Sequence, residues 1–232
     1  MNGEYMLYMM IAGGLSMVGG VISSRLKSKF QKYSQVPVNS GLSGKQIAEA
    51  MLSHYNIHDV RVVEGQGFLT DHYNPRTKTI SLSPPVYQGR SVSSAAVAAH
   101  ECGHAIQHDT SYSMLEMRSA LVPFVKFASW AQQGLLLFAF MAFNTFPQLM
   151  LIVIVAFAVT TMFSLVTLPV EFDASRRALV WLDETQVTSG QEHEGAKDAL
   201  WWAAMTYVAA ALSSLIMLVY LILKYTQSGR RR

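Results

Sequence analysis

The stretch His100-Glu101-Cys102-Gly103-His104 places two histidines four positions apart, with a carboxylate directly after the first. In an α-helix, residues i and i+4 lie on one face, so both imidazoles can bind the same metal ion. Glu101 then lies beside the ion without binding it, where its carboxylate can take a proton from a metal-bound water and pass it to a leaving amine. The spacing predicts metal-assisted hydrolysis of a peptide bond.

The residues on either side predict the helix that this spacing requires. Ser91 begins a serine-rich segment that can cap a helix start, and residues 95–99 are four alanines and a valine. Residues 109–111, Asp-Thr-Ser, are typical of a helix end. We therefore expect one helix from the serines to about residue 109.

Two other side chains of this helix are expected to have no part in binding the metal. Cys102 lies about 200° around the helix from His100, which predicts a buried, inert thiol. His108 lies about 6 Å beyond His104 along the helix axis, too far to share the ion.

Composition indicates a membrane protein rather than a soluble enzyme. Hydrophobic residues make up 51% of the chain and charged residues 14%, and the apolar residues gather in blocks. Four blocks have nearly the length of a membrane span: residues 5–22, 127–143, 149–168 and 203–223. A formal charge of +3, without a basic face interleaved with aromatic residues, gives no reason to expect nucleic acid as a partner.

The placement of charge predicts the orientation in the membrane. No lysine or arginine precedes the first span, whereas four basic residues follow it between positions 25 and 32, the reverse of a secretory signal peptide. By the positive-inside rule, the segment after this span is cytoplasmic. The basic residues 230–232 favour the opposite orientation, but first spans usually dominate. We expect a multi-pass protein of a bacterial-type cell membrane with its active site on the cytoplasmic side.

The segment between the first two spans has the composition of a soluble α+β unit. Ser43 and Gln46 form a capping-box pattern at the start of a short helix. Residues 60–63 and 78–83 are strand-like, and residues 71–76 have turn chemistry. We expect a small sheet in which the 78–83 strand lies at an edge, where a substrate peptide can pair with it.

Two histidines and a water leave a catalytic zinc ion one protein ligand short. The second and third spans are expected to form a hairpin with an uncharged turn at residues 144–148, which returns the chain to the membrane face that holds His100. Glu171 follows directly and is the natural third ligand. Asp173 is the alternative, but it lies about 200° around a helix from Glu171, so the two cannot both point at one ion.

These motifs resemble the integral-membrane zinc metallopeptidases of the HtpX and CAAX-prenyl protease group, and more closely the YugP-like family. The resemblance covers VAAHECGHAIQH at 97–108, DHYNPRTKT at 71–79 and TLPVEFDASRRA at 167–178. It implies Zn²⁺ as cofactor, Glu171 as third ligand and Glu101 as general base. The HtpX-like pattern has an aspartate where Ser175 stands here, a position that orients a ligand histidine. Ser175 can accept a hydrogen bond from imidazole without supplying charge, so either Asp173 supplies that charge or the site is less activated.

The expected fold is a mostly α membrane protein with four transmembrane helices and a small α+β zincin-like metallopeptidase domain inserted between the first and second. Its parts are transmembrane helix 1 (5–22), the metallopeptidase region (25–118), the hairpin of helices 2 and 3 (119–168), the third-ligand helix and polar connector (169–202), and transmembrane helix 4 (203–223).

The expected function is that of a zinc endopeptidase which cuts membrane-bound or misfolded polypeptides at the bilayer surface. Glu171 follows the end of a span by three residues, which puts the metal on the order of 5–10 Å from the hydrocarbon core. The alternative is a catalytically silent, metal-binding membrane chaperone or scaffold, in which Glu101 would not be needed. A transporter would normally carry ionisable groups at mid-span, and these spans have almost none.

Overall fold

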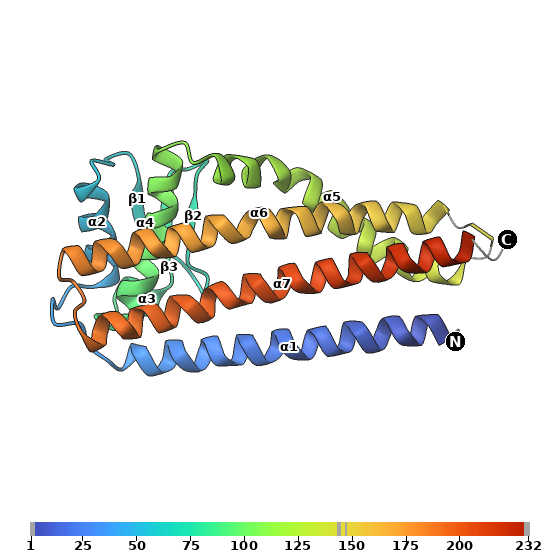
Figure 1. Cartoon of the computed structure of the whole chain (residues 1–232). Helices are drawn as coiled ribbons and strands as arrows, with labels where there is room; N and C mark the ends of the chain where they lie inside the picture. Colours follow the sequence, from blue (N-terminus) through green and yellow to red (C-terminus); the bar gives the residue numbers. More distant parts are fainter. Residues whose placement is uncertain (1–2, 143–144, 147, 230–232) are drawn as a thin grey trace. The chain divides into compact units, whose positions relative to one another are not determined.

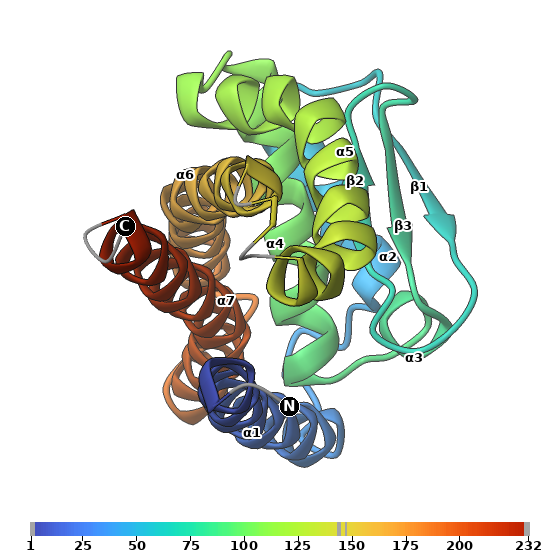
Figure 2. The ribbon, with the colours of Figure 1, turned by 90° about the vertical axis from the view of Figure 1, so that its right-hand side faces the viewer.

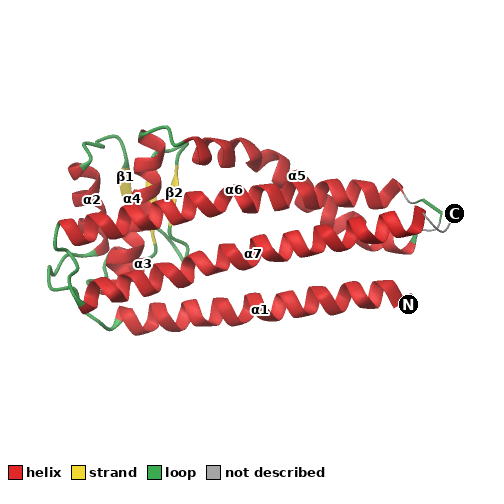
Figure 3. Ribbon diagram, viewed as in Figure 1, coloured by secondary structure: helices red, strands yellow, loops and turns green. Residues whose placement is uncertain are grey.

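The computed structural model describes residues 3–142, 145–146 and 148–229. Helices dominate these residues (Figure 1, Figure 3). The helices are α1 (Gly3–Ser34), α2 (Gly44–His54), α3 (Pro84–Tyr87), α4 (Val92–Asp109), α5 (Ser113–Met141), α6 (Gln148–Glu184) and α7 (Gln191–Gly229), and the strands are β1 (Arg61–Glu64), β2 (His72–Asn74) and β3 (Thr79–Leu82).

The chain divides into two compact units. The first comprises Met1–Ile22, Met117–Leu168 and Thr206–Arg232, and the second comprises Ser23–Glu116 and Pro169–Met205. Helix α6 continues through residue 168 without a break. The expected boundary between the transmembrane hairpin (119–168) and the third-ligand helix (169–202) therefore falls within a single helix. The second unit contains all the metal-ligand candidates.

Three helices in the described part of the chain are long and apolar enough to cross a bilayer: Tyr5–Ser34, Gln148–Glu184 and Gln191–Gln227. The fourth expected span, 127–143, lies mainly in α5, whose apolar character is interrupted by Gln132 and Gln133. Gln132 donates its side-chain N–H to Thr160 Oγ1 of α6 at 2.9 Å, which satisfies a polar group between helices. The fourth span remains a prediction, and residues 143, 144, 147 and 230–232 lie outside the described part.

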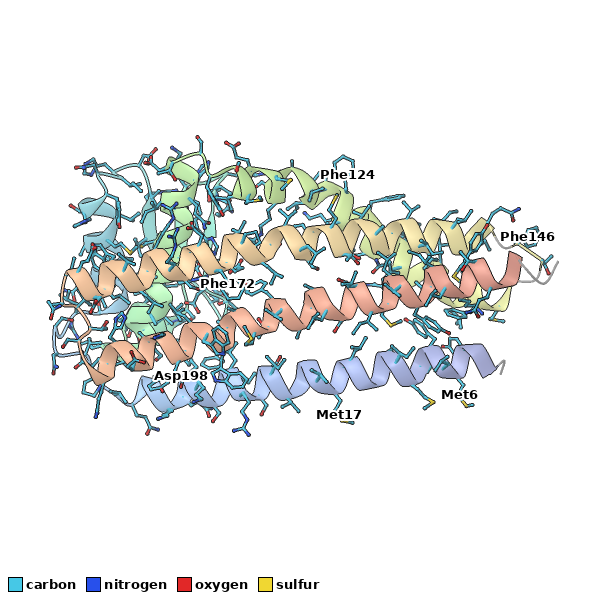
Figure 4. The ribbon with its side chains drawn as sticks, in the orientation of Figure 1. Met6, Met17, Phe124, Phe146, Phe172 and Asp198 are labelled. Atoms are coloured by element: carbon cyan, nitrogen blue, oxygen red, sulfur yellow. The ribbon has the colours of Figure 1, made fainter. Side chains whose placement is uncertain are left out.

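Aromatic side chains join three helices of the first unit. The ring of Tyr8 in α1 lies 5.1 Å from that of Phe140 in α5 and 6.3 Å from that of Tyr220 in α7. Apolar side chains on the opposite side of α1 are left exposed, among them Met6 and Met17 (Figure 4). A helix bundle with exposed apolar side chains of this kind suits a lipid environment.

The small sheet of the second unit has the order β1-β3-β2 (Figure 2). Strand β3 is parallel to β1 and antiparallel to β2, so that Ile80 lies opposite both Val62 and Tyr73. Ile80 and Leu82 are fully buried, as the alternating pattern predicts. The edge position expected for residues 78–83 is wrong, because both sides of β3 are already paired.

The reason for this error is the segment 71–76, which contains a strand as well as a turn. Residues of β2 pair with β3, and the turn comes afterwards, at residues 75–78. The Asn74 side chain accepts the backbone N–H groups of Arg76 and Thr77, and Lys78 has a left-handed backbone with φ 48°. Turn residues therefore mark the end of β2, and β1 and β2 are the two edge strands of this sheet.

The predicted capping residues of the second unit are confirmed. Ser43 and Gln46 form the reciprocal capping box at the start of α2. Helix α2 packs against α4, and Cys102 of α4 is fully buried with its S–H directed at the Ala48 carbonyl, 3.5 Å away. Burial raises the pKa of this thiol well above its ordinary value, which agrees with the inert cysteine predicted from its place on the helix.

Candidate metal centre

Helix α4 provides the two histidines. Its start is capped by Ser91, whose Oγ accepts the Ser94 N–H, and Thr110 is its C-cap. The His100 and His104 rings have centroids 4.8 Å apart and planes at 82°. The predicted helix is confirmed, and it presents both imidazoles on one face.

A close crossing of α4 and α6 brings in the third side chain. A Cβ atom placed on Gly103 would lie 2.5 Å from the carbonyl oxygen of Ala174. Since side-chain carbon atoms do not approach backbone oxygen that closely, this crossing needs a glycine. Glu171 lies on the same helix less than one turn before Ala174, and is therefore brought to the histidines.

The distances among the three side chains fit a tetrahedral metal ion. Glu171 Oε2 lies 3.3 Å from His100 Nε2 and 3.6 Å from His104 Nε2, and the three candidate ligand atoms lie within 4.8 Å of one another. Two ligands bound at zinc distances with a tetrahedral angle would be about 3.4 Å apart. Two nitrogens and one carboxylate oxygen also form a donor set that zinc prefers. The residues present fit the ion.

Each histidine also has a partner at its other ring nitrogen. His100 Nδ1 lies 3.1 Å from Ser175 Oγ, the contact expected from the sequence. His104 Nδ1 lies 3.0 Å from Oε1 of Gln107, a residue that the sequence reasoning did not consider. Its position three residues after His104, on the same helix face, is the signal that could have identified it.

Asp173 does not join the histidines and Glu171. Its carboxylate accepts hydrogen bonds from Gln107 Nε2 at 3.0 Å, Arg176 Nη2 at 2.5 Å and Arg177 Nε at 2.6 Å. Both arginines are therefore bound to Asp173 through side chains of the same helix. Gln107, which contacts both Asp173 and His104, links this carboxylate to the site by hydrogen bonds.

Burial changes the acid–base properties of the centre. Glu101 is 7% exposed, and burial raises the pKa of its carboxyl although the two neighbouring histidines oppose this shift. Burial alone would lower the pKa of His104, but the hydrogen bond to Glu171 and the nearby carboxylates raise it overall. Glu101 is therefore a stronger base than an exposed glutamate.

His108 lies outside this cluster, as expected. Its Nδ1 is 2.7 Å from the hydroxyl of Tyr73, a contact that connects α4 to β2. Burial, followed by the charges of Asp59 and Asp109, raises the pKa of Tyr73 to about 12. The phenol therefore stays neutral to a higher pH than an exposed tyrosine does.

Comparison with known proteins places these features in a family. Residues 5–226 match the family described as "Putative neutral zinc metallopeptidase". The chain is 41% identical over 199 residues to the "Putative membrane protease YugP" of Bacillus subtilis (strain 168), a match that covers 86% of this chain and 88% of that protein. No solved structure matches. The resemblance inferred from the motifs is confirmed. The family is one of zinc metallopeptidases, and its match includes His100, His104 and Glu171, the three residues that could hold a metal ion.

Proposed function

We propose that this chain, which belongs to the neutral zinc metallopeptidase family, is a membrane endopeptidase in which His100, His104 and Glu171 hold zinc. The observation that carries the proposal is the spacing of their ligand atoms, all within 4.8 Å, beside the buried carboxylate of Glu101. Bound zinc would lower the pKa of a coordinated water and polarise a substrate carbonyl.

Glu101 then acts as the general base. Its carboxylate takes the proton of the attacking water as the new C–O bond forms at the scissile carbonyl. It delivers this proton to the amide nitrogen as the C–N bond breaks. Burial supports the role, because a carboxylate whose pKa is raised holds the transferred proton more readily.

The substrates we propose are flexible segments of membrane-bound or misfolded polypeptides close to the cytoplasmic bilayer surface. Helix α6 carries the apolar stretch that ends at Leu168 and continues without a break to Glu171, a rise of about 4.5 Å along the axis. A ligand so close to the end of a span keeps the metal near the lipid surface. Such a position favours anchored substrates over compact soluble proteins.

An extended substrate would pair with β2 instead of the β3 strand expected from the sequence. Strand β2 is one of the two edges of the sheet, so its outer side can accept main-chain hydrogen bonds. The contact between Tyr73 and His108 holds β2 against the helix that carries Glu101. We propose that pairing at this edge presents the peptide to the site.

The decisive experiment compares Glu101→Gln with the wild-type protein on casein, with zinc content measured on the same preparations. We expect Glu101→Gln to retain zinc and lose hydrolysis, because only the proton acceptor is removed. Glu116→Gln is the matched control, since Glu116 is an exposed carboxylate at the start of α5, and it should hydrolyse casein as the wild type does. Equal hydrolysis by Glu101→Gln and the wild type would refute the role of Glu101 and leave the scaffold alternative ahead.

A further inference from the structure

Gln107 has a polar side chain that is completely buried, and the hydrolytic mechanism does not use it. Burying an amide without hydrogen bonds is costly, so its partners decide whether the side chain is tolerated. It has three: its Nε2 donates to the Val170 carbonyl at 2.8 Å and to Asp173 at 3.0 Å, and its Oε1 faces His104 Nδ1 at 3.0 Å. The amide therefore joins a metal-ligand candidate to helix α6.

These partners determine which way the amide points. A backbone carbonyl and a carboxylate can only accept hydrogen bonds, so the two N–H groups of Gln107 must be directed at Val170 and Asp173. Its oxygen is consequently the atom that faces His104. An amide oxygen is only an acceptor, so Nδ1 of His104 must carry the hydrogen.

A hydrogen on Nδ1 leaves the lone pair of the neutral imidazole on Nε2. Nε2 is the atom of His104 that lies 3.6 Å from Glu171, on the side where a metal ion would bind. The contact at His100 does not impose this choice, because the Ser175 hydroxyl can donate or accept. Of the two candidate ligand histidines, His104 is the one whose partner selects its tautomer.

We propose that Gln107 is a positioning residue for the metal: it holds His104 in the metal-binding tautomer and fixes its ring relative to α6. Asp173 anchors the amide, and is itself held by Arg176 and Arg177. The alternative is that Gln107 only fills space between α4 and α6. The inference rests on the proposed metal site but not on peptide hydrolysis, so it is tested by metal affinity.

The first experiment measures zinc affinity of the purified full-length protein by competition with a chromophoric chelator. Gln107→Leu has a similar size and no polar group, and we expect its zinc affinity to fall about 10–100-fold, as when other groups that hold ligand histidines are removed. Thr110→Val is the control, because it removes side-chain hydrogen bonds to the backbone carbonyls of Ile106 and Gln107 at the end of α4, without contact to a ligand or to the Gln107 amide. It should bind zinc as the wild type does.

The second experiment separates hydrogen bonding from packing. The double variant Gln107→Glu with Asp173→Asn reverses the polarity of the link: the introduced carboxylate accepts from His104 Nδ1–H and from the introduced amide, with no change in net charge. We expect it to bind zinc more tightly than Gln107→Leu and than Gln107→Glu alone, which sets two carboxylates side by side. Equal zinc affinities of all these variants, each with the thermal unfolding temperature of the wild type, would show that Gln107 only packs.

The outcomes also distinguish this inference from the proposed function. If the wild type binds zinc and Gln107→Leu binds it as tightly as Thr110→Val, the positioning role is refuted while hydrolysis is untouched. If Gln107→Leu loses affinity but Glu101→Gln still hydrolyses casein at the wild-type rate, the proposed chemistry fails and the positioning role stands.

Discussion

A single methyl group added at Gly103 should move Glu171 away from the two histidines of the metal centre. A Cβ there would lie 2.5 Å from the Ala174 carbonyl oxygen, whereas close carbon–oxygen contacts are about 3.3 Å, so α4 and α6 would have to separate by about 0.8 Å. Metal–ligand distances tolerate only about 0.2 Å. Glu171 is on α6 within one turn of Ala174, so the same separation moves its carboxylate away from both histidines.

We expect Gly103→Ala to lose at least about tenfold in zinc affinity, the lower bound for disturbed surroundings of metal ligands. Overpacking should also cost about 1–3 kcal/mol of unfolding free energy. Zinc affinity is measured by chelator competition, and stability by thermal unfolding of the metal-free protein. The two readouts separate a displaced ligand from a general loss of folding.

The matched control is Gly134→Ala in α5, where no heavy atom lies within 4 Å of the added Cβ. This variant should keep the zinc affinity of the wild type. If Gly103→Ala also binds zinc and hydrolyses casein as the wild type does, the close helix crossing does not set the metal geometry, and the reasoning is refuted.

Three further predictions concern the ligands, the β2 contact and the membrane. His100→Ala and Glu171→Ala should each abolish stoichiometric zinc binding in metal analysis, and full zinc in Glu171→Ala would move the third ligand elsewhere. The pKa of Tyr73 is raised from 10.0 to about 12, so its contribution to stability is complete below pH 10 and is lost as the pH rises to about 12. Tyr73→Phe lacks this titration, so its unfolding temperature should fall less steeply between pH 10 and about pH 12 than that of the wild type. Equal slopes of unfolding temperature against pH would contradict a raised pKa at Tyr73. In bilayers, cleavage should depend on the distance between a scissile segment and its transmembrane anchor, and equal cleavage of an unanchored peptide would oppose a site at the membrane surface.

Local signals were sufficient for the elements whose stability is local. Ser91 and the following alanines determined the start of α4, and the i, i+4 spacing put His100 and His104 on one face, because cap bonds and helical periodicity involve only neighbouring residues. The burial of Cys102 followed from the same geometry. Three of the four expected spans lie in helices that are long and apolar enough to cross a bilayer.

Contacts between distant segments were beyond the reach of such signals. The central place of β3 depends on β2, and the turn residues around Asn74 did not reveal that pairing, because strand pairing is decided by tertiary partners rather than by propensity.

The sequence by itself determined which residues are available as zinc ligands and as a base. They are two histidines on one helix face, a carboxylate beside the first and another after an apolar span. Only the tertiary structure decided how α4 and α6 cross. At that crossing Gly103 permits contact with Ala174, and Gln107 reaches Asp173 across the same interface. The physical reason is that the ligand atoms of a metal centre must be placed to within tenths of an ångström. Positions of that accuracy are set by backbones that pack against one another.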